Sequence, residues 1–391
     1  MIYDFDKLID RKDTASVKYD LTEKLFGRSD VLPMWVADMD FEVPEFIIEA
    51  LSERIKHRVF GYTFRPDSFF ETIASWISRR HGWDIGPETI AFSPGIVPAL
   101  NMCIIEFTDP GDAVVVQPPV YFPFFSAVSN HGRKLIHNQL LEENGHYMID
   151  YDALEESFRK GAKMFFLCNP HNPVGRVWTR TELERLADLC VRYQVLVVSD
   201  EIHSDLVLGG RKHIPLASLD KEIADLTLTC MAPSKTFNLA GLYTSMVIAT
   251  NPELKKRYEI VLDAVHVGGD NIFGQLALEA AYTYGDEWLD QLLVYLEKNY
   301  QLLYRQLTSS VPGLIVSPLE ATYLVWLDFS FLGKSDSELK EFMIRQAGLG
   351  LNDGPMFGPG GEQHQRMNIA TPHSVLEEGI GRLILAVNGE R

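Results

Sequence analysis

Short apolar runs alternate with longer amphipathic stretches through the middle of the chain. Helical patterns separate the apolar runs, which we predict to be buried strands at residues 89–92, 113–117, 164–168, 195–199, 227–231 and 245–249. Strands that alternate with helices in this way are typical of a mainly parallel sheet covered by helices on both faces. The pattern therefore predicts an α/β fold.

Two capping boxes predict where helices begin. A hydroxyl residue followed three residues later by glutamate occurs at Thr179 and again at Ser335, and each pair precedes an amphipathic stretch. The second of these helices lies between strands that we expect at residues 323–327 and 366–369. A last helix is expected from about Ser374.

The pattern changes past about Asn299, where strand, helix, strand and helix follow one another. This order predicts a small α+β unit. A chain of 391 residues is also too long for one compact core and suits two domains. We expect a large domain at residues 45–290, and a small domain with an N-terminal arm at residues 1–44 and 291–391.

The composition narrows the class of protein. A formal net charge of −18 repels nucleic acid and anionic lipid, so we expect neither as a partner. No apolar run approaches the roughly 18 residues of a membrane helix. The chain does not begin with a basic stretch followed by an apolar one, so we expect a cytoplasmic protein. Four cysteines stand in apolar surroundings and are expected to be small buried hydrophobes without a metal or disulfide role: Cys103, Cys168, Cys190 and Cys230.

Polar residues follow four of the predicted strands at the edge where parallel sheets bind ligands. Ser93, Pro94 and Gly95 follow the first strand, and Asn172 lies in the segment after the third. The groups that follow the fourth and fifth strands are Asp200, His203, Ser234 and Lys235. Their arrival at one rim predicts a cofactor site.

The residue types fit pyridoxal phosphate. Its aldehyde needs an amine, and a partly desolvated lysine such as Lys235 is nucleophilic. A carboxylate such as Asp200 holds a proton on the pyridine nitrogen, and the amide of Asn172 can donate to the ring oxygen. Tyr121 can stack on the ring. The phosphate requires amides at a helix N-terminus, which Gly95, Ile96 and Val97 can supply.

Each of these residues also has a more ordinary interpretation when it is taken singly. Lys235 could be a solvated surface charge, and Asp200 could be a helix N-cap. Asn172 could be a turn residue, Tyr121 part of the core, and Gly95 a common strand-to-helix turn. The arrival of all five at the same end of different strands favours the cofactor site.

The order and spacing of three blocks resemble a known family. The blocks NPHNPVG, SDEIHSDL and APSKTFNLAG are similar to the core motifs of fold type I pyridoxal phosphate enzymes, the aspartate aminotransferase superfamily. The resemblance extends over nearly the whole chain. It implies a large domain with a seven-stranded sheet, a small domain made of both chain ends, and a homodimer whose active sites lie at the interface.

The resemblance also implies roles for residues outside these blocks. Arg366 in QRMNIATP would clamp the substrate α-carboxylate through two parallel hydrogen bonds. Tyr62 would reach the cofactor phosphate of the neighbouring subunit, and Ala37, Asn172 and Tyr121 would contact the substrate. The ordinary alternatives are a surface arginine on an edge strand and a packed aromatic side chain.

Departures from the aminotransferase pattern indicate a branch of the superfamily. His203 stands where aminotransferases commonly carry tyrosine, and Tyr243 stands where many carry an arginine for the phosphate. The phosphate would then depend more on helix amides, Ser234 and Tyr62. The blocks PMWVADMDF and DEIH resemble the cystathionine β-lyase branch, the MalY/PatB-like carbon–sulfur lyases. The segment that includes Trp35 could equally be an arm that packs on the partner subunit.

This branch implies β-elimination of S-substituted cysteines such as L-cystathionine, which yields a thiol, pyruvate and ammonia. Lys235, as general base, would remove the Cα proton, and Asp200 and Tyr121 would assist. Two rival hypotheses remain. One is an aminotransferase, and the other is a regulatory protein that binds pyridoxal phosphate.

Overall fold

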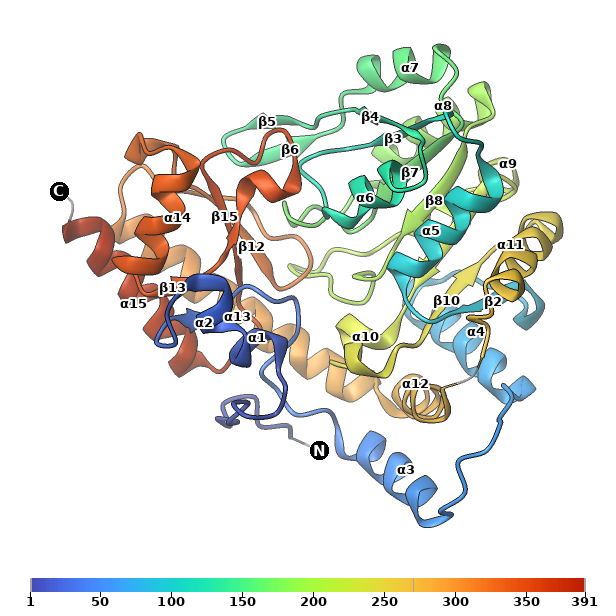
Figure 1. Cartoon of the computed structure of the whole chain (residues 1–391), viewed down its shortest axis with the longest axis horizontal. Coiled ribbons are helices and arrows are strands. Elements are labelled where there is room, and N and C mark those ends of the chain that lie inside the picture. Colours follow the sequence, from blue (N-terminus) through green and yellow to red (C-terminus); the bar gives the residue numbers. More distant parts are fainter. Residues whose placement is uncertain (1, 270, 390–391) are drawn as a thin grey trace.

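The computed structural model describes residues 2–269 and 271–389, and its largest element is a sheet of seven strands (Figure 1). The strands lie in the order β2-β10-β9-β8-β7-β3-β4. Strand β10 runs antiparallel to both neighbours, and the other pairs are parallel. The predicted α/β fold with a mainly parallel sheet is confirmed. Its strands are β2 (Ile90–Ser93), β3 (Ala113–Val116), β4 (Lys134–His137), β7 (Met164–Cys168), β8 (Leu196–Asp200), β9 (Thr227–Met231) and β10 (Ser245–Ile248).

Six of these strands are the ones that the apolar runs predict, and their bounds differ from the prediction by no more than one residue. Strand β4 does not follow from the apolar pattern. It lies at the edge of the sheet, its first and last residues are exposed, and only Leu135 and Ile136 are half-buried. A strand covered so little by other elements carries no strong hydrophobic signal.

Side chains from successive strand positions enter two different cores, which is why the strands read as continuous apolar runs. Phe166 packs with helices on one face of the sheet, and Phe165 packs with helices on the other. Helices α5 (Ile96–Phe107), α6 (Pro123–Ser129) and α11 (Pro252–Ala264) cover the first face. Helices α7 (Tyr151–Arg159), α8 (Arg180–Tyr193) and α9 (Lys221–Ala224) cover the second.

A second, antiparallel sheet lies beside the first and has the order β11-β12-β15-β14 (Figure 1). Its strands are β11 (Ile315–Val316), β12 (Leu324–Asp328), β14 (Asn352–Asp353) and β15 (His364–Asn368). Both predicted capping boxes form, at Thr179 before α8 and at Ser335 before α14 (Asp336–Arg345). The final helix, α15, spans His373–Gly389.

The two ends of the chain meet beside the second sheet. Strand β1 (Leu32–Pro33) pairs in parallel with β13 (Leu349–Gly350). Figure 1 shows the N-terminal helices α1 (Val17–Asp20) and α2 (Thr22–Phe26) next to this pair. One hydrophobic cluster contains residues from the N-terminal arm, the second sheet and α13 (Asp286–Ser310). The predicted domain bounds at residues 44–45 and 290–291 stay a prediction, and α13 crosses the second of them.

The other elements complete the chain. They are α3 (Glu45–Lys56), α4 (Asp67–His81), α10 (Pro233–Thr236), α12 (Ile272–Tyr284), the hairpin β5 (Leu141–Glu143) and β6 (His146–Met148), and the 3-10 turns η1 (Pro87–Thr89), η2 (Leu216–Ser218), η3 (Ala240–Leu242), η4 (Ser330–Leu332) and η5 (Gly354–Phe357).

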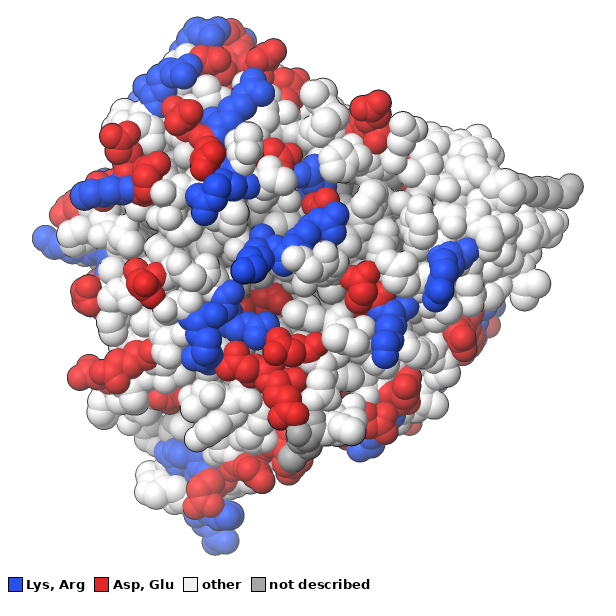
Figure 2. Space-filling view, turned by 180° about the vertical axis from the view of Figure 1, so that it is seen from behind, with Lys and Arg blue, Asp and Glu red and all other residues white. Residues whose placement is uncertain are grey.

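The surface charge is mixed in sign on one face of the molecule. Figure 2 shows Lys and Arg side chains lying among Asp and Glu side chains across that face. The net charge of −18 is therefore not gathered there into a single acidic patch. Among the helices of residues 2–269 and 271–389, none has the length and apolar character that a membrane span requires.

Candidate active site

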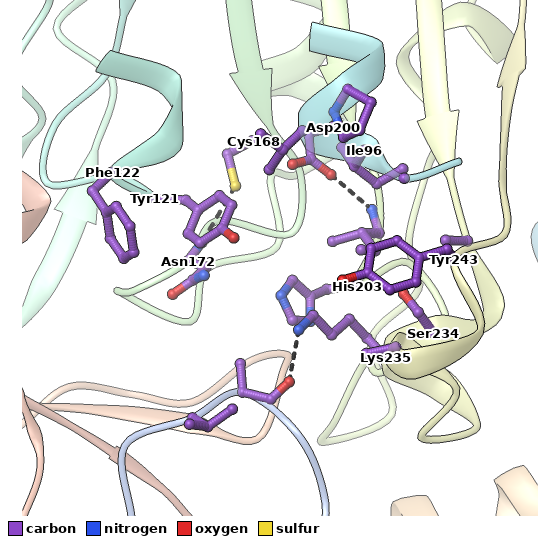
Figure 3. Close-up of a pocket in the computed structure, with 18 of the residues that line it drawn as sticks. Ile96, Tyr121, Phe122, Cys168, Asn172, Asp200, His203, Ser234, Lys235 and Tyr243 are labelled. Carbon is purple, nitrogen blue, oxygen red and sulfur yellow. Dashed lines mark hydrogen bonds between the residues drawn. The ribbon is translucent and has the colours of Figure 1, made fainter. Parts of the chain in front are cut away.

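A cavity of about 410 Å³ lies at the carboxyl edge of the large sheet. The segments that follow β2, β3, β7, β8 and β9 supply most of its wall, and the N-terminal arm, β14 and β15 supply the rest. Figure 3 shows Asp200 and Lys235 approaching this cavity from opposite sides. All the predicted site residues except Tyr62 thus lie around one cavity.

Lys235 belongs to α10, the short helix that follows β9. Its Nζ atom donates a hydrogen bond of 2.6 Å to the carbonyl oxygen of Ala37. Burial, and then the nearby charge of Arg366, lower the pKa of the lysine from 10.5 to about 8. A larger fraction of the amine is therefore neutral and nucleophilic at neutral pH than for a lysine in water, and the surface-charge interpretation fails.

Asp200 is the last residue of β8 and is 3% exposed. Its Oδ1 atom accepts a hydrogen bond of 3.1 Å from the amide of Ile202. Burial raises the pKa of this carboxyl to about 7, while the bond from Ile202 and the charge of Lys235 act in the opposite direction. Within the described residues no cation forms an ion pair with Asp200. A cationic ring nitrogen in the cavity would supply the missing partner.

Arg366 lies on β15 and is 4% exposed, so it is not the surface arginine of the ordinary alternative. Nη1 donates to Oδ1 of Asn172 at 2.9 Å, and Nη2 donates to Oδ1 of Asn352 at 2.6 Å and to the carbonyl of Trp35 at 3.1 Å. Burial lowers the pKa of the guanidinium to about 10. No carboxylate of the described chain pairs with it, and its Nε is buried without a partner. A substrate carboxylate would satisfy this cation.

The N-terminus of α5 forms the anion-binding side of the cavity. Gly95 caps this helix of 12 residues, and Ile96 and Val97 follow it on the cavity wall. Free amides and the helix dipole at such an end favour a phosphate group. Ser234 adds a hydroxyl to the wall, and Tyr243 lies nearby with most of its side chain exposed.

Tyr121 and His203 contribute ring surfaces to the wall. Burial, followed by the Asp200 charge, raises the pKa of Tyr121, which keeps its phenol protonated. Burial, together with the charges of Lys235 and Arg366, holds the pKa of His203 well below its ordinary value. His203 is therefore neutral, and its buried Nδ1 has no hydrogen-bond partner. A polar ligand atom could satisfy that nitrogen.

Tyr62 does not join the other predicted residues. It lies in an irregular segment between α3 and α4, its side chain is fully exposed, and it is absent from the cavity wall. Its predicted contact with a neighbouring subunit stays a prediction.

Several wall residues were not among the predicted site residues. Asn352 accepts a hydrogen bond from Arg366, a tertiary contact that no local pattern indicates. Trp35 lies two residues before Ala37 in the block PMWVADMDF, which resembles the lyase branch. The rest carry no chemistry that a sequence pattern could reveal, and include Val17, Val36, Phe122, Cys168 and Ile202.

These features together test whether the residues fit pyridoxal phosphate. The ring nitrogen, the phosphate and the aldehyde would find Asp200, the α5 amides and Lys235 respectively. Arg366 and the Nδ1 of His203 are buried polar groups whose partners are incomplete. The donor set therefore fits the cofactor that the residue types suggest.

Comparisons with known proteins agree with this geometry. The family model described as aminotransferase class I and II matches residues 29–383. The chain is 47% identical to cystathionine beta-lyase PatB of Bacillus subtilis (strain 168) over 385 residues, 98% of this chain and 100% of the relative. It is 34% identical to protein MalY of Escherichia coli (strain K12) over 393 residues, 100% of each chain.

A solved structure extends the comparison to three dimensions. Cystalysin from Treponema denticola, whose structure contains a pyridoxal 5'-phosphate cofactor, matches with a TM-score of 0.97 at 38% identity. The match covers 100% of both chains.

The lowered pKa of Lys235 predicts its reactivity. In the protein stripped of ligands, reductive methylation of Lys235 should be half-maximal near pH 8, because the amine loses its proton there. An ordinary exposed lysine titrates near 10.4. Replacing Arg366 with Met removes a like charge and should move the midpoint upward, whereas Arg180→Met on exposed α8 should not. Mass spectrometry of the Lys235 peptide measures this, and a wild-type midpoint near 10.4 would contradict it.

Proposed function

The chain belongs to the class I and II aminotransferase family, and we propose that it is a pyridoxal phosphate-dependent carbon–sulfur β-lyase. It eliminates the thiol from S-substituted cysteines such as L-cystathionine and yields pyruvate and ammonia. The observation that carries this proposal is the set of Lys235, Asp200 and Arg366 around one cavity, in which Asp200 and Arg366 are buried and the Nε of Arg366 has no partner. This set stands in a chain 47% identical to a cystathionine beta-lyase over nearly its full length.

Pyridoxal phosphate, when bound, supplies an electron sink for the charge left at Cα after deprotonation. Asp200 keeps a proton on the ring nitrogen, because a carboxylate next to that nitrogen favours its cationic form. Burial alone favours a neutral Asp200, and a cationic ring nitrogen beside it would favour its charged form. The α5 amides and Ser234 hold the phosphate.

Arg366 binds the substrate α-carboxylate through the N–H donors that the protein leaves free, its Nε among them, and thereby fixes the rotation about the Cα–N bond. Asn172, Asn352 and the carbonyl of Trp35 hold the guanidinium in place. Because those contacts come from three different parts of the chain, the orientation of Arg366 is set before substrate arrives.

Lys235 removes the proton from Cα, since its lowered pKa gives it a larger neutral fraction near neutral pH than an ordinary lysine has. The Cβ–S bond then breaks, and the thiolate takes a proton from Lys235 or from the phenol of Tyr121. Addition of water to the remaining three-carbon fragment gives pyruvate and ammonia. L-cystathionine and water thus yield homocysteine, pyruvate and ammonia.

An exposed apolar segment supports a proposal for the assembly. Val59, Phe60, Tyr62 and Phe64 are all largely exposed in one irregular stretch. Exposed apolar surface of this kind supports an interface between subunits. We propose a homodimer in which Tyr62 reaches the partner's cofactor phosphate.

The domain bounds and the cellular location are also proposed. We assign residues 45–290 to a large domain, and residues 1–44 with 291–391 to a small one, which the pairing of β1 with β13 supports. A cytoplasmic location is supported by the acidic composition and by four cysteines that are buried and free.

The reaction can be measured without any oxo-acid cosubstrate. The purified protein with pyridoxal phosphate should release thiol, pyruvate and ammonia from L-cystathionine in equal amounts. Arg366→Ala should lower kcat/KM by roughly 100-fold, because two charge-assisted hydrogen bonds to the substrate are lost, and should retain the cofactor. Arg180→Ala, on an exposed face, serves as the matched control. Efficient amino-group exchange with 2-oxoglutarate, alongside negligible pyruvate, would favour an aminotransferase instead.

Sharing of the site between subunits has its own test. Tyr62→Ala and Lys235→Ala dimers should each be nearly inactive, because one lacks a phosphate contact and the other lacks the base. Mixed dimers should regain part of the activity, since one of their two sites contains both native residues. The assay is pyruvate release after subunit exchange has been verified by mass spectrometry. Absence of recovery would argue against a shared site.

A further inference from the structure

The segment from Trp35 to Met39 is held by hydrogen bonds and by ion pairs. On the cavity side, its main-chain carbonyls accept hydrogen bonds from site residues. Arg366 donates to Trp35, Lys235 donates to Ala37, and the phenol of Tyr323 donates to Ala37 as well, at 3.0 Å. The position of this backbone therefore sets where the Lys235 amine lies.

Side chains from the second sheet and from the large sheet's loops complete that side. Asn368 Nδ2 donates to the carbonyls of Val36 and Asp38, both at 2.6 Å. Asn238 Nδ2 donates to the carbonyl of Met39 at 2.9 Å. Each carbonyl from Trp35 to Met39 thus has a side-chain donor.

The segment also joins a cluster of four charged residues, in which Asp38 of the segment and its neighbour Asp40 pair with Arg11 and Lys18. We call them the arm quartet, because Arg11 and Lys18 belong to the N-terminal arm. Lys18 Nζ lies 2.6 Å from Asp40 Oδ2. Arg11 contacts Asp38 through Nη2 and Asp40 through Nη1, both at 2.7 Å. Arg11 also donates to the carbonyl of Met39 at 3.2 Å.

The arm quartet is buried to an unusual degree for an ion-pair cluster. Lys18 is 1% exposed and Asp40 is 5% exposed, and two positive charges balance two negative ones. Buried pairs of this kind add little net stability, because removing the charges from water offsets their attraction. Removal of one partner leaves an uncompensated buried charge. Such a cluster fixes geometry more than it strengthens the fold.

The arm also reaches the cavity itself. Val17, which precedes Lys18, lines the wall together with Trp35. The indole of Trp35 donates to the carbonyl of Lys18 at 3.2 Å. The charged and titratable groups that face Lys235 are Asp38, Asp200, Arg366, His203 and Tyr323. Asp38 therefore belongs both to the arm quartet and to the surroundings of the lysine.

We propose that the arm quartet is a positioning device for Lys235. It fixes the Trp35–Met39 backbone, so that the Ala37 carbonyl holds the amine at the cavity and the Asp38 carboxylate stays at a set distance from it. This role deepens the proposed function, since it rests on Lys235 as the reacting amine. Lys18 and Arg11 act through the segment and do not touch the substrate.

The test combines two variants with a matched control from the same arm. Lys18→Met removes two ion pairs, the one with Asp40 at 2.6 Å and a longer one with Asp38 at 3.8 Å. The double variant Lys18→Met, Asp40→Asn also removes the opposite charge, so that Arg11 and Asp38 remain as a balanced pair and folding is preserved. Lys7→Met is the control, because Lys7 forms a 2.5 Å ion pair with Glu42 in the same arm but is half-exposed.

The first measurement does not depend on lyase activity. Full-length protein stripped of cofactor is mixed with pyridoxal phosphate, and its attachment to Lys235 is followed by reduction and mass spectrometry. Attachment should slow about tenfold in both variants, because misplacing a reacting group lowers its rate steeply. The pH midpoint of Lys235 methylation should shift, since the complete arm quartet no longer fixes the distance between the amine and the Asp38 carboxylate, whose charge favours the protonated amine. Lys7→Met should match the wild type in its attachment rate and in its pH midpoint.

The second measurement is turnover of L-cystathionine by the loaded enzyme, where kcat should fall about tenfold in the two variants. Wild-type attachment rate, midpoint and kcat in the folded double variant, with only the melting temperature lowered, would overturn the proposal. Failure of the wild type itself to release pyruvate would refute the proposed function. The attachment experiment would still test the positioning role in that case.

Discussion

The structure depends on one constraint: three ionisable groups are withdrawn from water at one cavity, and none of them has a full partner in the described chain. Burial pushes Lys235 and Asp200 toward their neutral forms, and it leaves the guanidinium of Arg366 facing the cavity without a carboxylate. Desolvation of this kind is costly unless something compensates. A cationic ring, an aldehyde and a carboxylate are the compensating groups, so cofactor and substrate complete an arrangement that the protein leaves unfinished.

The fold makes this arrangement possible because parallel strands end at a common edge. Strands β8 and β9 deliver Asp200 and the α10 helix of Lys235, and the loop after β7 delivers Asn172. The second sheet contributes Arg366 from β15, and the N-terminal arm contributes the carbonyl of Ala37. Residues far apart in the chain thus meet at the lysine. The arm quartet links the last of these contributions to a cluster of four charged side chains.

Much of the fold and of the site could be predicted from the sequence, and the features that could not be predicted have physical reasons. Apolar runs revealed six strands of the large sheet, and glutamates at the right spacing revealed the caps at Thr179 and Ser335. Edge strand β4 lacks a buried face, so the apolar pattern does not predict it. The partners of Arg366 and the arm quartet are tertiary contacts between distant segments, which no local pattern encodes. Tyr62 is a different case, because a single chain cannot test a contact between subunits.

The central claim is that Lys235 is the amine that holds the cofactor. The most direct measurement is borohydride reduction of the protein loaded with pyridoxal phosphate, followed by digestion and mass spectrometry of the labelled peptide. The account predicts one label per chain, on the peptide that contains Lys235, and none in a Lys235→Ala variant. A label on another lysine, or equal labelling of the variant, would contradict it.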